Sequence, residues 1–215
     1  MKKILTTLVL SGAMAAPLHA DGLSTYQVSI TNATTHQVLT PPVLVSHNNA
    51  YAVFTVGSPA SAGLVTQAET GNPAPLALEV SNAVGVMDVV TGSNVIPYGQ
   101  TSTFQITASK RGRITLTTML ATTNDGFAAL NSVALPKRSA QYFAYVYDAG
   151  SEYNNENCSY IPGPPCAPDS GNARTDSGEG FVSIHNGIHG IDDLVAASLD
   201  WRGPAAIVTI TRIDD

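Results

Sequence analysis

Acidic residues stand close together in the second half of the chain, in short polar segments. Asp125 lies in the sequence T-N-D-G, and both Asp148 and Glu152 lie in Y-D-A-G-S-E. Glu156 follows in N-N-E-N. Three or four carboxylates gathered in one place repel one another, and a hard cation such as calcium relieves this by taking roughly 6–8 oxygen ligands. The residue types therefore predict a calcium site, provided that the fold brings these acids together.

The strands expected around these acids would bring them together. Four segments read as consecutive strands, namely 101–108, 113–121, 127–135 and 141–147. If they form an up-and-down meander, alternate turns fall at opposite ends of the sheet. The turns that carry Asp125 and Asp148 then share one end, which the start of the first of these strands also reaches.

Two other interpretations of these acids stay open. Asp-Gly and Asp-Ala-Gly are ordinary turn sequences, because Asp bonds to its own backbone and glycine supplies a positive φ. Alternatively, two of the acids could act as a glycosidase pair, which needs carboxyl groups roughly 5–9.5 Å apart beside a cleft. The D-x-D-x-D-G spacing of an EF-hand loop does not occur.

Other residues offer weaker chemistry. His185 and His189 have the spacing of zinc ligands on a helix, but Gly187 and Gly190 oppose a helix and favour a turn. Trp201 is the only tryptophan, and we expect it to pack on the core, with a ligand-stacking ring as the alternative. No G-x-S-x-G nucleophile motif occurs, and nothing in the sequence selects a catalytic triad.

Alternating apolar and polar residues predict an all-β fold. The alternation is clear in 26–32 and 113–120, and 141–147 is rich in aromatic and β-branched residues. Further short strands are expected at 43–45, 50–56, 84–90, 101–108, 127–135, 181–185 and 205–212. Residues 59–70 suggest a short helix closed by Gly71, and 75–83 stay undecided. Many short strands between turns predict an antiparallel β-sandwich of about eight strands, with long loops at one end.

The first residues predict export. Lys2 and Lys3 precede an apolar run that ends in Pro-Leu-His-Ala, the layout of a secretory signal peptide cleaved after Ala20. The run is shorter than the roughly 20 apolar residues that span a bilayer, and no later stretch is apolar enough. We therefore expect a signal peptide at 1–20 and a periplasmic or secreted protein without an integral membrane segment.

The remaining residues, 21–215, suit one domain with its own core. Removing the signal peptide changes the formal charge from −6 to −8, and a chain this acidic is unsuited to binding nucleic acid. Cys158 and Cys166 are the only cysteines, and in an oxidising compartment we expect them to form one disulfide that closes a small loop.

These motifs together resemble the spondin N-terminal domain, known from animal matrix proteins and exported bacterial proteins. The resemblance runs roughly from residue 24 to 212, and its most specific parts are T-N-D-G-F, Y-D-A-G-S-E and the closing V-T-I-T-R. It implies a sandwich similar to calcium-dependent membrane-targeting (C2-type) domains, with calcium bound by Asp125, Asp148 and Glu152. Gln105 stands where animal members have a further acid, so it offers only a neutral carbonyl, and Glu156 could supplement the ligands.

The resemblance implies a calcium-binding recognition or adhesion module without evident catalytic machinery. Its partner would be an extracellular or envelope protein, or a glycan. Two alternatives stay open from the residues: an exported hydrolase that acts on a carbohydrate or ester with a metal-supported carboxylate site, and a structural protein of the envelope or matrix.

Overall fold

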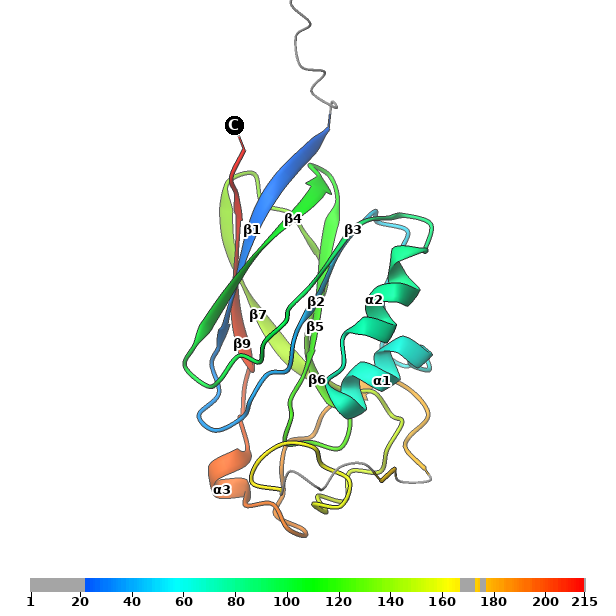
Figure 1. The fold of residues 1–215 in the computed structure, drawn as a ribbon, viewed down its shortest axis with the longest axis vertical. Helices are drawn as coiled ribbons and strands as arrows, with labels where there is room; N and C mark the ends of the chain where they lie inside the picture. Colours follow the sequence, from blue (N-terminus) through cyan, green and yellow to red (C-terminus); the bar gives the residue numbers. More distant parts are fainter. Residues whose placement is uncertain (1–21, 167–172, 175–176, 215) are drawn as a thin grey trace, which may run out of the picture.

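The protein is an antiparallel β-sandwich (Figure 1). The computed structural model describes residues 22–166, 173–174 and 177–214, so the expected signal peptide lies outside the described residues. The strands are β1 (Leu23–Asn32), β2 (Val43–His47), β3 (Val86–Thr91), β4 (Thr101–Ser109), β5 (Arg113–Met119), β6 (Gly126–Ala134), β7 (Ser139–Asp148), β8 (Ser183–Ile184) and β9 (Ala206–Arg212). The helices are α1 (Ala62–Thr70), α2 (Ala74–Ser81) and α3 (Ala196–Leu199). The predicted fold class is confirmed.

Strand β7 belongs to both layers of the sandwich. Its first half, 139–144, pairs with β9, and its second half, 145–148, pairs with β6. One layer is therefore β4-β1-β9-β7 and the other is β7-β6-β5-β2-β3, with β8 beside the end of β7. The meander β5-β6-β7 is as predicted, but β4 pairs with β1. The turn at 110–112 thus crosses between the layers instead of closing a hairpin.

The main core fills the space between the two layers. Every second residue of β1 faces it, so that Tyr26, Val28 and Ile30 are fully buried while the residues between them are half-exposed. Ile114 and Leu116 of β5 pack from the opposite layer. Burial of each such side chain stabilises the fold by roughly 1.5–3 kcal/mol, so apolar residues are favoured at every inward-facing position. The alternation of apolar and polar residues in the sequence therefore predicts the layers correctly.

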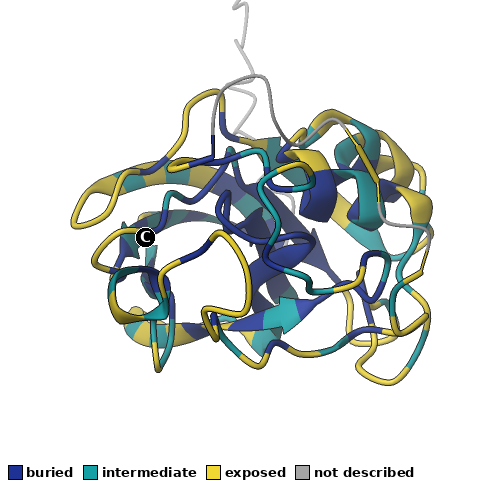
Figure 2. Cartoon of the chain, turned by 90° about the horizontal axis from the view of Figure 1, so that it is seen from below, coloured by how far each residue is buried: buried dark blue, intermediate teal, exposed yellow. Residues whose placement is uncertain are grey.

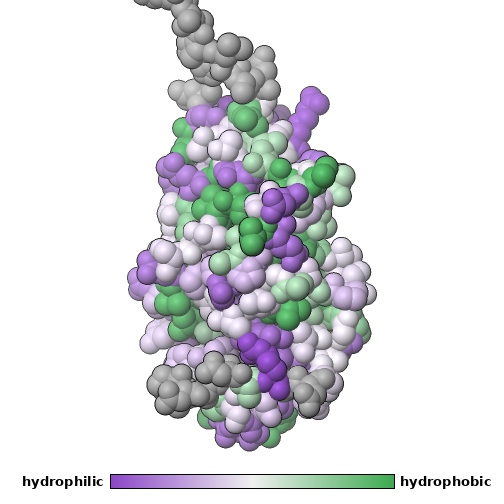
Figure 3. All heavy atoms as spheres, turned by 45° about the vertical axis from the view of Figure 1, so that its right-hand side comes forward, coloured by the Kyte–Doolittle hydropathy of each residue, from purple (hydrophilic) through white to green (hydrophobic). Residues whose placement is uncertain are grey.

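A second core lies between the β2–β5–β6 layer and the helices. Figure 1 shows α1 and α2 on that face, and Leu64 and Leu76 of these helices pack against Val43 and Phe127 of the strands. Gly71 ends α1 in the left-handed region, at φ 71°, as expected. The outer surface on this side mixes hydrophilic and hydrophobic side chains (Figure 3). The undecided segment 75–83 corresponds to α2.

The strand predicted at 50–56 is wrong. The backbone turns there, because the Asn48 side chain accepts hydrogen bonds from the amides of residues 50 and 51. Phe54 then packs edge-on against Phe127 and Tyr147, with ring centroids 5.2 and 5.1 Å apart. The apolar residues of this segment serve the core below the helices rather than a ladder of backbone hydrogen bonds.

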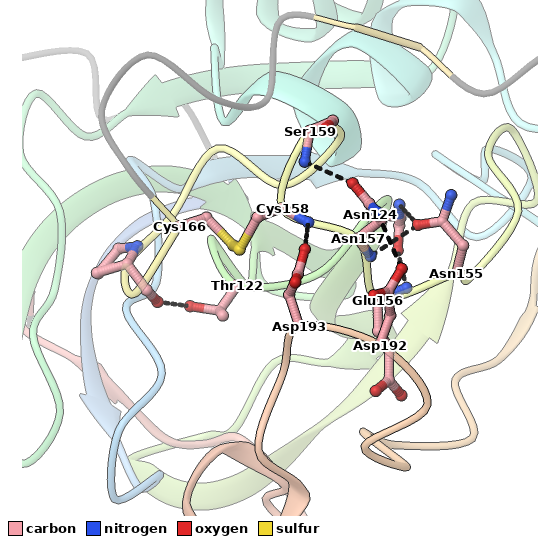
Figure 4. Close-up of a disulfide and its surroundings, with 11 residues drawn as sticks. Thr122, Asn124, Asn155, Glu156, Asn157, Cys158, Ser159, Cys166, Asp192 and Asp193 are labelled. Carbon is pink, nitrogen blue, oxygen red and sulfur yellow. Dashed lines mark hydrogen bonds between the residues drawn. A yellow bond between two sulfur atoms is a disulfide. The ribbon is translucent and has the colours of Figure 1, made fainter.

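Long loops gather at one end of the sandwich, which we call the loop end: residues 120–125 and the described parts of 149–205. Figure 2 views the molecule from this end and shows exposed loops around a buried centre. The loop end has a small core of its own, which includes Ile161, Ile188 and Leu194. The predicted disulfide between Cys158 and Cys166 is present, with their Cα atoms 5.0 Å apart (Figure 4). No helix in the described ranges is long and apolar enough to cross a membrane.

Candidate metal centre

Asp125 lies in the turn between β5 and β6, and its side chain points into the protein. The Thr123 hydroxyl shapes this turn by accepting a hydrogen bond from the Gly126 amide at 2.9 Å. The Asp125 carboxylate is fully buried, and its Oδ2 accepts hydrogen bonds from the Ser151 amide at 2.7 Å and the Glu152 amide at 3.0 Å. Asp125 therefore holds the loop that follows β7.

Asp148 is the last residue of β7 and sits opposite Gly126 in the ladder. Its Oδ1 accepts a hydrogen bond from the Gly150 amide at 2.6 Å, and its Oδ2 accepts one from the Asn154 side chain. Gly150 has φ 70°, and a Cβ there would lie 2.3 Å from the carbonyl oxygen of Phe181. The Asp-Ala-Gly turn thus brings the Asp148 carboxylate beside Asp125 and requires glycine at its third position.

The two carboxylates make an unfavourable pair when both are charged. Burial and the negative charge of Asp148 raise the pKa of Asp125 to about 7, against the lowering effect of the amide hydrogen bonds. Burial also raises the pKa of Asp148. The second oxygen of Asp125, Oδ1, is buried and has no hydrogen-bond partner among the described residues. A cation beside this oxygen would compensate the charge of both acids.

Glu152 lies in the same buried region but faces a guanidinium group. Its Oε1 is 3.6 Å from Nη1 of Arg174, whose Nε is 2.8 Å from Oε2 of Glu69, at the end of α1. The carboxylate of Glu152 is fully buried. The fold therefore brings Glu152 next to Asp125 through its backbone, while a positive side chain balances the charge of its carboxylate.

Glu156 is held by backbone amides. Its Oε1 accepts a hydrogen bond from the His189 amide at 2.5 Å, and its Oε2 accepts from Gly190 and Ile191 at 2.7 and 3.0 Å. Successive amides that converge in this way form a concave anion site. The Glu156 carboxylate fills it and so fixes the 189–191 loop against residues 155–157.

Gln105 is not brought to this site. It lies in the middle of β4, opposite Gln27 of β1, and its side chain is exposed on the outer face of the other layer. In the described ranges, no group of three or more His, Cys, Asp or Glu side chains is arranged to hold a metal ion. The residues that fit a hard cation are thus the pair Asp125 and Asp148, and further oxygen ligands would have to come from backbone carbonyls or water.

His185 is a buried residue whose role the sequence did not indicate. Its Nδ1 accepts a hydrogen bond from the Gly187 amide at 3.0 Å. Its ring makes a T-shaped contact with the Trp201 ring, with the two centroids 5.1 Å apart. Burial, aided by the nearby His189, lowers the pKa of His185 to about 4. Because the neutral ring accepts at Nδ1, its proton must be at Nε2. The H-N-G-I-H segment is not helical, as its glycines predict. The burial of His185, by contrast, depends on packing against residues distant in the sequence, such as Trp201.

A pocket of about 190 Å³ opens beside the two acids at the loop end. Its lining includes Asn124, Asn154, His185 and His189, together with the backbone-bound Glu156. Asp125 and Asp148 lie behind this lining and do not contribute to it. The pocket can offer amide and imidazole hydrogen bonds to a ligand, whereas the paired carboxylates are enclosed.

No model of a known protein family matches the sequence, and no curated protein matches it either. The resemblance to the spondin N-terminal domain therefore stays an expectation that rests on the motifs themselves.

Proposed function

We propose that the protein is an exported calcium-binding recognition module of the spondin type. The observation that carries this proposal is the buried Oδ1 of Asp125, which lacks a hydrogen-bond partner among the described residues and lies in a carboxylate that repels Asp148. Calcium favours carboxylate and carbonyl oxygens and accepts irregular ligand sets. Calcium bound between Asp125 and Asp148 would replace the repulsion of the two carboxylates with bonds from both of them to the ion.

In this proposal the ion orders the loops and does not itself meet the partner. Both carboxylates are buried, Asp125 with none of its surface exposed and Asp148 with 3%. They link the β5–β6 turn, the end of β7 and the loop at 150–152. The recognition surface would be the neighbouring loop end, where the disulfide fixes the loop and side chains such as Tyr153 and Ile191 are exposed.

The alternatives have less support. A hydrolase would need acids that reach a substrate, and neither Asp125 nor Asp148 lines the 190 Å³ pocket. A purely structural envelope protein is compatible with an enclosed ion, but it leaves the polar pocket at the loop end without a role. The binding module accounts for both features.

The proposal is tested by titrating calcium into chelator-treated protein by calorimetry and by following the melting temperature. Asp148→Asn is the test variant, and Asp192→Asn is the control, because Asp192 is an exposed acid of the loop end. We expect heat and stabilisation for the wild type and the control but not for Asp148→Asn. At a calcium concentration 100 times Kd the gain is about 2.7 kcal/mol. Absence of both signals up to millimolar calcium would refute the proposal.

A further inference from the structure

In the part of the chain that the structure describes, no helix covers the outer face of the β4-β1-β9-β7 layer (Figure 1). On β1, β4 and β9, and on β7 as far as Tyr145, the odd-numbered residues point outward, because the even-numbered ones face the main core. The register aligns them in rows across the strands. One row joins Thr103, Ser29, Thr209 and Gln141, and its neighbours continue the same chemistry.

Among the described strand residues, none with a charged side chain points to this face. Its odd-numbered residues in β1, β4, β9 and β7 are Thr, Ser, Gln and a few apolar residues. Hydroxyl pairs bond across the strands, as between Ser29 and Thr103 at 3.0 Å and between Ser139 and Thr211 at 2.7 Å. Solvent-facing strands, and edge strands such as β4 above all, usually carry charges that prevent association. A broad uncharged polar face is suited to an uncharged polar partner.

Aromatic rings stand along β7, where this face meets the other layer. Phe143 and Tyr145 follow each other on the outer side of β7, and 50% and 55% of their surfaces are exposed. Tyr145 also lines a pocket of about 340 Å³ together with Trp201, Asn186 and Arg202. The Arg202 Nε donates to Asp200 Oδ2 at 3.2 Å. The pocket therefore combines the aromatic rings of Tyr145 and Trp201, and the imidazole of His185, with planar hydrogen-bonding groups.

We propose that this face binds a neutral polysaccharide chain, with Tyr145 and the pocket beside it as the anchor. A sugar ring has an apolar C–H face, which packs on aromatic rings, and a rim of hydroxyl groups, which bond to Asn, Gln, Ser and Thr. Pockets that combine apolar walls with a few convergent polar groups are the usual form of small-ligand sites. A peptide strand would instead pair with an open sheet edge, whereas these rings lie on the face.

The inference goes beyond the calcium proposal and does not depend on it. Neither Asp125 nor Asp148 lies on this face or lines its pocket, although the pocket shares His185 and Asn186 with the pocket of about 190 Å³, so polysaccharide binding is expected in the presence of chelator. Loss of binding through chelation would show that the ligand depends on the loops ordered by the ion and would overturn this inference. Failure to bind calcium would leave it intact.

The test measures retention of the protein on insoluble cellulose and chitin, with the acidic polymer alginate for comparison. The test variant is Tyr145→Ala. The matched control is Tyr98→Ala, because Tyr98 is 54% exposed but lies beside His36, outside the face. We expect binding to at least one neutral polymer that is insensitive to ~0.5 M salt and about tenfold weaker in Tyr145→Ala. The control should bind like the wild type.

A second variant guards against misfolding of the first. Thr103→Lys adds one charge at an exposed position of the face, away from the aromatic rings, and should weaken retention as well, since the charge would lose water on binding. Four results would overturn the inference: no retention on either neutral polymer, retention on alginate alone that salt abolishes, equal binding by both tyrosine variants, or a dimer in sedimentation that Tyr145→Ala dissociates.

Discussion

Replacing Asp125 with asparagine should stabilise the calcium-free protein, and increasingly so as the pH rises. Asparagine keeps an oxygen that can accept the Ser151 and Glu152 amides, which the Asp125 Oδ2 accepts at 2.7 and 3.0 Å. It removes the charge that is buried beside Asp148. The substitution therefore separates the hydrogen bonds of this side chain from its electrostatic cost.

The magnitude follows from the pKa of Asp125, which is raised from its usual 3.8 to about 7. Below pH 3.8 the group is protonated in both states, and its contribution to stability is fully present. As the pH rises from 3.8 to about 7, the unfolded chain ionises first and this contribution is lost. At 1.36 kcal/mol per pH unit, the shift corresponds to roughly 4 kcal/mol, an upper limit because side chains and water relax around a buried charge.

The assay is urea unfolding of wild type and Asp125→Asn in chelator, at pH values from about 4 to 8. We expect the difference in the free energy of unfolding to be near zero at the acidic end and to reach a few kcal/mol, in favour of the variant, at the alkaline end. The contribution of His185 is common to both proteins and cancels in the difference. A difference that does not vary with pH, or a variant that is less stable at pH 8, would refute this account of the site.

Four further variants test other parts of the structure. Glu156→Ala removes the acceptor of three backbone amides and should cost about 1–3 kcal/mol in urea unfolding, whereas calcium binding should persist in calorimetry. As the pH falls from 6.5 to about 4, the His185 ring stays neutral in the folded wild type but becomes protonated in the unfolded chain, which lowers the free energy of unfolding by roughly 3 kcal/mol. His185→Gln should abolish this loss. The urea midpoints of the wild type and the variant at the two pH values measure it. Changing Cys158 and Cys166 together to serine should cost about 2–3 kcal/mol of unfolding free energy, since the bridge closes a short loop, and more than about 5 kcal/mol would show that the loop-end core had collapsed too. Gly163→Ala places a Cβ 2.3 Å from the Ala121 carbonyl oxygen and should lower stability by about 1–3 kcal/mol, visible as a lower melting temperature.

The sequence predicts the layers of the fold well because burial on one side leaves a strict alternation. That signal is plain in β1 and β5, whose inward residues form the main core. It does not say which strands are partners, so β4 was expected beside β5 although its ladder is with β1. It is misleading at 50–56, where Phe54 packs into an aromatic cluster from an irregular backbone. The apolar character of a segment indicates that its residues are buried. It does not indicate whether a strand or an irregular segment carries them.

The candidate site was predictable in part. The turn sequences around Asp125 and Asp148 place both acids at the ends of antiparallel neighbours, and the ladder between β6 and β7 brings them together as expected. The sequence does not predict the partners of the other acids, because the guanidinium near Glu152 and the amides around Glu156 come from distant loops. A carboxylate in a sequence carries no mark of whether a cation, an arginine or the backbone will balance its charge.

The pairing of the first strand with the last has a consequence for how the chain reaches its native state. In the ladder between β1 and β9, Tyr26 lies opposite Arg212, so almost the whole sequence separates the two partners. Contacts this distant close very large loops, whose entropy must be overcome before the contacts contribute, and such topologies fold slowly. The N-terminal strand therefore has no complete sheet to join until the last residues of the domain are available. Assembly of this layer has to follow the synthesis of β9, and removal of β9 should leave β1 without one of its two neighbours.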